Sequence, residues 1–182
     1  IATSANRAAE PIVIDNDEAL QSLQGIADLF LVHDRPIVGR CDDSIVRVVK
    51  EREMILRRAR GYAPLPVTVN KPFAKPVLAV GGHLKNTVVL AINNQVFLSP
   101  HIGDLDTAKA CAAHGEATDL LCDIYQAKPE LIAHDLHPDY RSSQMTEGRK
   151  AHKISVQHHY AHALACMADN NVQAVSYTHL RA

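Results

Sequence analysis

Residues 77–98 have the sequence VLAVGGHLKNTVVLAINNQVFL, in which three short runs of β-type residues are separated by turn-forming pairs. The runs are Val77–Val80, Thr87–Ile92 and Gln95–Leu98, and the connections contain Gly81-Gly82 and Asn93-Asn94. Glycine and asparagine pairs suit tight turns between paired strands. The stretch therefore predicts an antiparallel meander of three strands.

The residues after the meander alternate between helix and strand patterns. They predict helices over about 107–126, 138–148 and 158–169, and strands at Leu131–His134, ending at Asp135, and at Ile154–Val156. Three antiparallel strands followed by alternating helix and strand are typical of a ribonuclease-H-like domain, in which parallel strands enter after the meander.

The residues before the meander form a second, mixed α/β region. We expect strands at Ile12–Ile14, Phe30–Val32 and Ile45–Val49, and a helix over Asp17–Asp28 that Asp15 or Asn16 could cap. Four prolines then fall between residues 62 and 76, a density that disfavours both helix interiors and central strands. The domain boundary is predicted there.

The composition narrows the class of protein. Nineteen basic and twenty acidic side chains give a net charge of −1, so no long-range field that attracts nucleic acid or anionic membrane is expected. No apolar run approaches the roughly 18 residues that span a bilayer. The four cysteines form no C-x-x-C pair and are expected to be free thiols in a reducing cytoplasm. The start at Ile1 predicts an internal piece of a longer protein.

His158 and His162 are the strongest candidate metal ligands. They lie four residues apart, so on a helix they occupy the same face and can bind one metal ion through their imidazoles. They follow a predicted buried strand, at the carboxyl end where α/β sheets place their ligands. A polar helix start with solvated histidines is an equally weighted alternative, and two ligands do not complete a metal site.

Two other groups of residues could bind phosphate. The Gly81-Gly82 connection allows close backbone approach while Lys85 adds a charge, although turn geometry alone also explains the glycines. In the first region, Ser4 and Asn6 offer small polar groups and the arginines offer charges suited to a triphosphate or carboxylate. Solvated arginines at a domain edge are the alternative.

The order of these motifs resembles the HypF family. The motifs TSAN (3–6), RCDDS (40–44) and RRARGYAP (57–64) are similar to the end of its YrdC-like domain. The motifs LKNT (84–87), LSPHIGDL (98–105), DLHPDY (135–140) and VQHHYAH (156–162) are similar to the start of its ASKHA-type carbamoyltransferase domain. The resemblance implies an α/β chain with YrdC-like residues 1–61, a linker at 62–76, ribonuclease-H-like (ASKHA) residues 77–175, and a tail at 176–182 outside the family pattern.

The resemblance also implies a function in [NiFe]-hydrogenase maturation. Such enzymes form carbamoyl-adenylate from carbamoyl phosphate and ATP with Mg²⁺, and transfer the carbamoyl group to a cysteine of HypE for cyanide ligand synthesis. His158 and His162 would then bind a divalent metal, zinc or iron. Lys85, Asn86 and Asp104 would serve catalysis. The implied nucleotide and carbamoyl phosphate ligands are Ser4, Asn6, Arg35, Arg40, Ser44 and Arg58.

The chain departs from the family pattern at several positions. His83 stands where glutamate is common, Tyr160 where a third histidine is frequent, and no glycine-rich phosphate loop follows Val172. We therefore expect the chain to be inactive by itself. The alternatives are a related carbamoyl- or threonylcarbamoyl-transferase acting on tRNA or a small molecule, a module that binds double-stranded RNA, and a structural metal protein. None of these readings involves a membrane.

Overall fold

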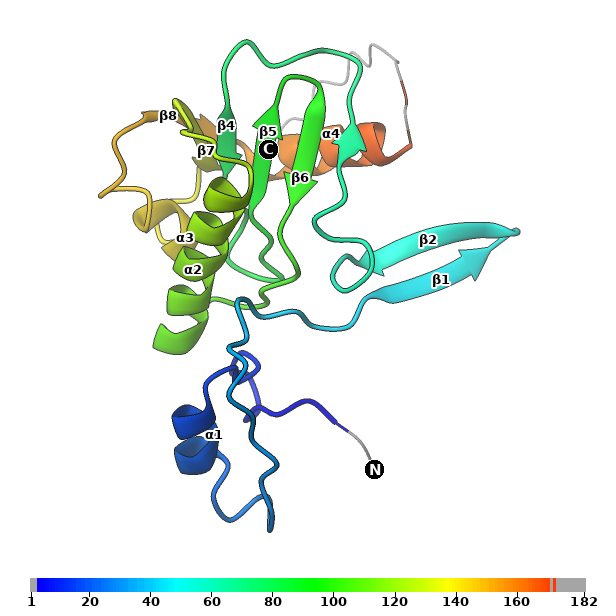
Figure 1. Cartoon of the computed structure of the whole chain (residues 1–182). Helices are drawn as coiled ribbons and strands as arrows, with labels where there is room; N and C mark the ends of the chain where they lie inside the picture. Colours follow the sequence, from blue (N-terminus) through cyan, green and yellow to red (C-terminus); the bar gives the residue numbers. More distant parts are fainter. Residues whose placement is uncertain (1–2, 171, 173–182) are drawn as a thin grey trace.

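A six-stranded sheet forms the centre of the computed structural model, which describes residues 3–170 and 172 (Figure 1). Its strand order is β3-β6-β5-β4-β7-β8. The strands are β3 Val67–Thr68, β4 Val77–Ala79, β5 Val89–Ile92, β6 Gln95–Leu98, β7 Leu131–Asp135 and β8 His152–Val156. Strands β4, β5 and β6 are antiparallel, while β7 and β8 run parallel to β4. The predicted meander and the predicted entry of parallel strands are both confirmed.

The longest helix, α2 (Ala108–Ile124), packs on this sheet (Figure 1). It starts at Thr107, whose side-chain oxygen accepts a hydrogen bond from the backbone N–H of Ala110, as N-cap residues do. Its Leu121 joins the main hydrophobic core, with sheet residues from β4 to β7. The core consists of Leu78, Val80, Val88, Leu90, Phe97, Leu121 and Ile132. This core fixes the position of β4 and β7, from which the candidate site extends.

Helix α4 (His158–Asp169) follows β8 and crosses behind the sheet in the view of Figure 1. Its bounds match the predicted helix, but none of its residues is buried. The predicted helix over 138–148 is wrong in length, because only α3 (Arg141–Gln144) is helical. Beyond it the chain forms i→i+3 turns, in which Thr146 and Glu147 bond back to Ser143 and Gln144.

The N-terminal part contains α1 (Asn16–Ser22) and a separate antiparallel hairpin of β1 (Ile45–Val49) and β2 (Arg52–Arg57). Asp15 caps α1, as expected, by accepting a hydrogen bond from the N–H of Glu18. The prediction that the helix reaches Asp28 is wrong. The chain turns at Gly25, whose φ of +79° is left-handed and incompatible with a continuing helix.

The predicted strands at 12–14 and 30–32 are also wrong. No strand partners pair with them within the described residues. The Ile12 carbonyl accepts from Arg40, and the His33 carbonyl just beyond the second run accepts from Asn16. The proline-rich segment, in contrast, contributes β3, which pairs Val67 with Val96 at the edge of the main sheet.

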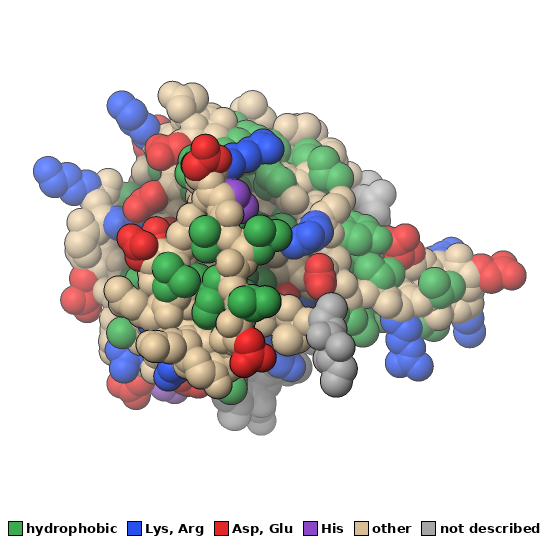
Figure 2. Space-filling view, turned by 60° about the horizontal axis from the view of Figure 1, so that its bottom comes forward, with side chains coloured by type: hydrophobic (Ala, Val, Ile, Leu, Met, Phe, Trp, Pro, Cys, Tyr) green, Lys and Arg blue, Asp and Glu red, His purple; other side chains and the backbone are tan. Residues whose placement is uncertain are grey.

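Ion pairs join the N-terminal part to α2. Lys109 binds Glu10 at 3.0 Å and Glu18 at 3.1 Å, and Arg40 pairs with Glu116. Exposed pairs of this kind are worth about 0–1 kcal/mol each. The most exposed large hydrophobic side chains of the described residues, Leu29, Leu31 and Val38, also belong to this part. Figure 2 shows hydrophobic side chains gathered among charged ones on the lower face of the molecule.

Among the described residues, no helix has the length and apolar character needed to cross a membrane.

Candidate metal centre

Three parallel strands carry the candidate site at their carboxyl ends. Gly81 and Gly82 follow β4, Asp135 ends β7, and His158 begins α4 two residues after β8. Strands β4 and β8 flank β7 in parallel register, so their carboxyl ends lie at one edge of the sheet. This is the edge at which open α/β sheets place their ligands.

His158 and His162 face each other across one helical turn. Their Nε2 atoms lie 3.1 Å apart. Two imidazole nitrogens that bind one tetrahedral zinc ion at about 2.0–2.1 Å would lie roughly 3.3 Å apart. The separation of the two nitrogens is therefore compatible with a shared metal ion.

Asp135 sets the orientation of His158. Its Oδ2 accepts a hydrogen bond from His158 Nδ1 at 2.6 Å, and its Oδ1 accepts from the backbone N–H of His137 at 2.9 Å. The carboxylate is 8% exposed, whereas the His158 side chain is 53% exposed. A carboxylate that holds the proton on Nδ1 leaves the Nε2 lone pair free to bind a metal.

Asp135 was not among the predicted site residues, although the sequence contains a signal for it. An aspartate at the end of a predicted buried strand, at the same sheet edge as the candidate ligands, is well placed to support them.

Aromatic rings form one wall beside the histidine pair. Tyr140 stacks on His137 with ring centroids 4.4 Å apart, and its ring meets His158 edge-on at 6.1 Å. His83 lies 5.7 Å from Tyr140 and forms a 2.9 Å contact between its Nε2 and Asp106 Oδ1. The wall limits the directions from which a ligand can approach His158.

Within the described residues, no group of three or more His, Cys, Asp or Glu side chains is arranged to bind a metal ion. His158 and His162 could supply two ligands, and Asp135 contacts one of them, His158. The metal-ligand roles of the two histidines and the nature of the metal, zinc or iron, stay predictions.

The predicted residues Lys85, Asn86 and Asp104 lie together beside the Gly81–Gly82 loop. The backbone N–H of Lys85 donates to Asp104 Oδ1 at 2.7 Å. Asn86 is 1% exposed, and its side-chain Nδ2 donates to the carbonyls of Val80 and Gly82. The Nδ2 of Asn86 is therefore occupied by the protein itself, whereas its Oδ1 is buried without a hydrogen-bond partner among the described residues. The catalytic roles of these three residues stay predictions.

The six predicted nucleotide and carbamoyl phosphate ligands are more dispersed. Among the hydrogen bonds and ion pairs of the described residues, Ser4 and Asn6 are the only two of them that contact each other. Arg40 contacts the Ile12 carbonyl and Glu116, while Ser44 Oγ donates to the Arg60 carbonyl at 2.9 Å and accepts from the Ala59 N–H at 2.8 Å. The Arg58 guanidinium lies 5.9 Å from the centre of the Tyr62 ring. Arg35 lines a surface hollow near α1.

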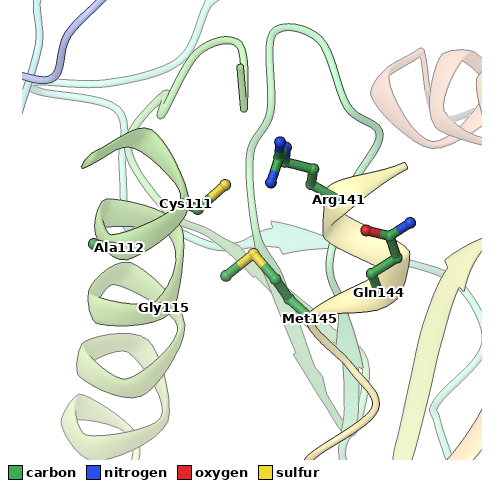
Figure 3. Close-up of a pocket in the computed structure, with 6 residues that line it drawn as sticks. All are labelled: Cys111, Ala112, Gly115, Arg141, Gln144 and Met145. Carbon is green, nitrogen blue, oxygen red and sulfur yellow. The ribbon is translucent and has the colours of Figure 1, made fainter. Parts of the chain in front are cut away.

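A separate pocket of about 500 Å³ lies between α2 and α3 (Figure 3). Small α2 residues line one side and longer side chains line the other. The lining residues are Cys111, Ala112, Gly115, Arg141, Gln144 and Met145. None of the predicted site residues lines this pocket.

The strand order and the helix positions define the class of protein: an α/β chain with a ribonuclease-H-like domain of the ASKHA type. Comparison with family models refines this class. The model of the HypF Kae1-like domain matches residues 72–169, and a Sua5/YciO/YrdC model described as telomere recombination matches residues 1–59. The chain belongs to the HypF family.

Individual relatives agree with this membership. The chain is 52% identical to carbamoyltransferase HypF of Synechocystis sp. over 97% of its length, and 45% identical to that of Rhizobium leguminosarum bv. viciae over 94%. A crystal structure of full-length HypF in a phosphate- and nucleotide-bound form matches 94% of the chain at 44% identity, with a TM-score of 0.88. The T. kodakarensis HypF structure matches 93% at 36% identity and a TM-score of 0.83.

The chain spans about a quarter of the length of these relatives: 23% of the Synechocystis protein and 27% of the crystallised full-length chain.

Proposed function

We propose that the chain is part of a carbamoyltransferase that acts in [NiFe]-hydrogenase maturation. The observation that carries the proposal is the His158–His162 pair with its buried Asp135 support, within a segment 52% identical to a carbamoyltransferase HypF. In this proposal, residues 1–61 are the end of a YrdC-like domain, 62–76 connect, and 77–175 begin the carbamoyltransferase domain. Residues 173–182, including the predicted tail, lie outside the described part of the chain.

The proposed reaction has two stages. The first forms carbamoyl-adenylate from carbamoyl phosphate and ATP with Mg²⁺, and the second transfers the carbamoyl group to a cysteine of HypE. A relative crystallised with phosphate and nucleotide supports the use of ATP. The arginines of the N-terminal part, Arg35, Arg40 and Arg58, would bind anionic oxygens, with Ser4, Asn6 and Ser44 as further donors.

In the second stage, the chain's own residues would bind and orient the reacting group. His158 and His162 would hold a divalent metal, zinc or iron, through Nε2, and Asp135 would keep His158 in the tautomer that allows it. A metal bound there would polarise the carbonyl oxygen of the carbamoyl group. The aromatic wall of His137 and Tyr140 would limit water access on that side.

The metal part of the proposal is tested by zinc titration of the purified chain. The double variant His158→Ala, His162→Ala should lose binding, while His159→Ala, on the same helical turn, should retain it. Equal zinc affinity in all three proteins would refute the assignment of the metal ligands.

The transfer part is tested in a chimera. This chain replaces the matching segment of the Synechocystis relative, and carbamoyl transfer to a HypE cysteine is measured. Activity should survive the exchange, since the segments are 52% identical, and should be lost with the double histidine variant. A fully active double variant would contradict the proposed role of the pair.

A nucleic-acid-binding role for the YrdC-like part is a weaker candidate, because a net charge of −1 gives the chain no long-range field that attracts nucleic acid. Weak binding of double-stranded RNA would show as a salt-dependent mobility shift.

A further inference from the structure

The backbone carbonyl of Val80, directly before the Gly81–Gly82 loop, accepts hydrogen bonds from two buried side chains. Asn86 Nδ2 donates to it at 2.9 Å, and His114 Nε2 lies 3.1 Å away. The N–H of Val80 donates to the carbonyl of Ala133 in β7 at 3.1 Å. His114 belongs to the middle of α2 and is 3% exposed. The backbone of Val80 is thus hydrogen-bonded to β7, to the Asn86 side chain and to His114 of α2.

The loop that follows lies against the proposed metal ligand. A Cβ added to Gly82 would come within 3.5 Å of His158 Cε1. One added to Gly81 would lie 2.6 Å from the Thr87 carbonyl oxygen and 2.8 Å from Asn86 Nδ2. The loop therefore lies between Asn86 and the His158 ring: it is tightly packed on the Asn86 side, and a methyl group on Gly82 would reach ordinary van der Waals distance from the ring. A displacement of the loop on the Asn86 side changes the space beside the His158 ring.

Hydrophobic packing alone does not account for a histidine at position 114. Burial lowers the pKa of His114, so the ring is neutral and carries a single N–H. The bond to the Val80 carbonyl requires that proton on Nε2. The other nitrogen, Nδ1, is buried with no hydrogen-bond partner among the described residues. An apolar side chain would fill the space without that unpaired group, whose burial costs about 1–3 kcal/mol.

We propose that His114 is a positioning residue: through the Val80 carbonyl it sets the Gly81–Gly82 loop against His158, and thereby the direction of the His158 imidazole. The inference rests on the proposed metal role of His158 and His162. The competing interpretation is that His114 only fills the core between α2 and β4.

Two substitutions of nearly equal size separate these interpretations. His114→Gln keeps an N–H donor at the reach of Nε2, whereas His114→Met removes it and retains the length of the side chain. Thr118→Val is the matched control. Thr118 is a buried α2 residue, 1% exposed, whose hydroxyl donates to the His114 carbonyl and not to the loop.

The first measurement uses the metal-free chain. The amide resonances of Gly81 and Gly82 and the Cε1–H resonance of His158 should shift in His114→Met. They should stay near their original positions in His114→Gln and Thr118→Val. The second measurement is zinc affinity, which His114→Met should weaken by roughly 10-fold, at the lower end of the effect of residues that support metal ligands from outside the coordination sphere.

The outcomes divide clearly. A variant His114→Met that is less heat-stable but leaves the loop and His158 resonances unchanged overturns the proposal. So does a Thr118→Val variant that shifts them equally. If His114→Met does not fold, His114→Gln still decides, because a shifted loop in that variant contradicts the positioning role. If the unaltered chain binds no zinc, the proposed metal role fails, and the metal-free resonances still test His114.

Discussion

Replacing Asp135 by asparagine should weaken metal binding without removing a metal ligand. In the protein, Oδ2 of Asp135 accepts from His158 Nδ1, and Oδ1 accepts from the His137 N–H. Both partners are donors, so the site needs two acceptors. Asparagine has the same shape but supplies one acceptor and one donor.

Either orientation of the new amide breaks one contact. With its NH₂ group toward His158, the histidine must place its proton on Nε2, which removes the lone pair that would bind the metal. With its oxygen toward His158, the NH₂ group meets the His137 N–H, and a donor remains unpaired at a side chain that is 8% exposed. Loss of such supporting contacts weakens metal affinity by about 10- to 100-fold, or roughly 1.4–2.8 kcal/mol.

The assay is a competition titration of zinc against a chromophoric chelator, at fixed pH and ionic strength. Asp139→Asn is the charge-matched control: Asp139 lies four residues further on, and its carboxylate forms no hydrogen bond or ion pair with His158 among the described residues. The control should bind zinc as the unaltered chain does. Equal affinities for Asp135→Asn and Asp139→Asn would refute the argument, because charge alone would then explain any effect.

Three further perturbations test the fold around the site. Gly81→Ala should lower the free energy of unfolding in urea by more than about 1 kcal/mol, because Gly81 has φ +70° and the new Cβ meets backbone. Gly115→Ala should raise it by about 0.5–1 kcal/mol, because Gly115 lies in a helix interior with open space around it. Leu78→Ala should lower the free energy of unfolding by about 2–5 kcal/mol, because Leu78 is buried in the core. The same change at the exposed Leu29 should lower it by less than about 0.5 kcal/mol. Burial lowers the pKa of His114 below 6.5, so this side chain takes up a proton more readily in the unfolded chain than in the folded one. The free energy of unfolding should therefore fall as the pH drops below about 6.5, and His114→Gln should reduce this dependence on pH.

The part of the fold that the sequence predicts best is the part with a regular pattern and a buried face. The predictions of the meander, α2 and β7 are confirmed, because their apolar residues form the core. Those of β8 and α4 are also confirmed, although neither element contains a buried residue. Predictions failed where short apolar runs had no strand to pair with, as at residues 12–14 and 30–32. β3 was missed for the opposite reason: Val67 and Thr68 lie among prolines but find a partner strand, β6.

In the candidate site, too, local sequence signals predict the structure and contacts between distant residues do not show in the sequence. The i, i+4 spacing of His158 and His162 is a local signal, and the two rings do face each other. The contacts of Asp135 and His114 depend on residues 23 and 34 positions away, so only the folded sheet brings them to the site. The arginines and small polar residues of the N-terminal part carry no spacing signal, and the described contacts do not gather them into one site.

The candidate site has a buried part in the sheet and α2 and an exposed part on α4, and this difference determines which part a metal ion would stabilise. Asp135, Asn86 and His114 are buried in the sheet and α2, whereas α4 has no buried residue. His158 contacts both parts, because its Nδ1 bonds to Asp135 while its Nε2 faces His162. Among the described residues, the side-chain contacts of His162 are with His158 of the same helix. A metal shared by the two rings would cross-link the first turn of α4, because both ligands belong to that helix, and would stabilise the start of the helix. At a free metal concentration of 100 times Kd, that stabilisation is worth about 2.7 kcal/mol, which is several times the contribution of one exposed ion pair.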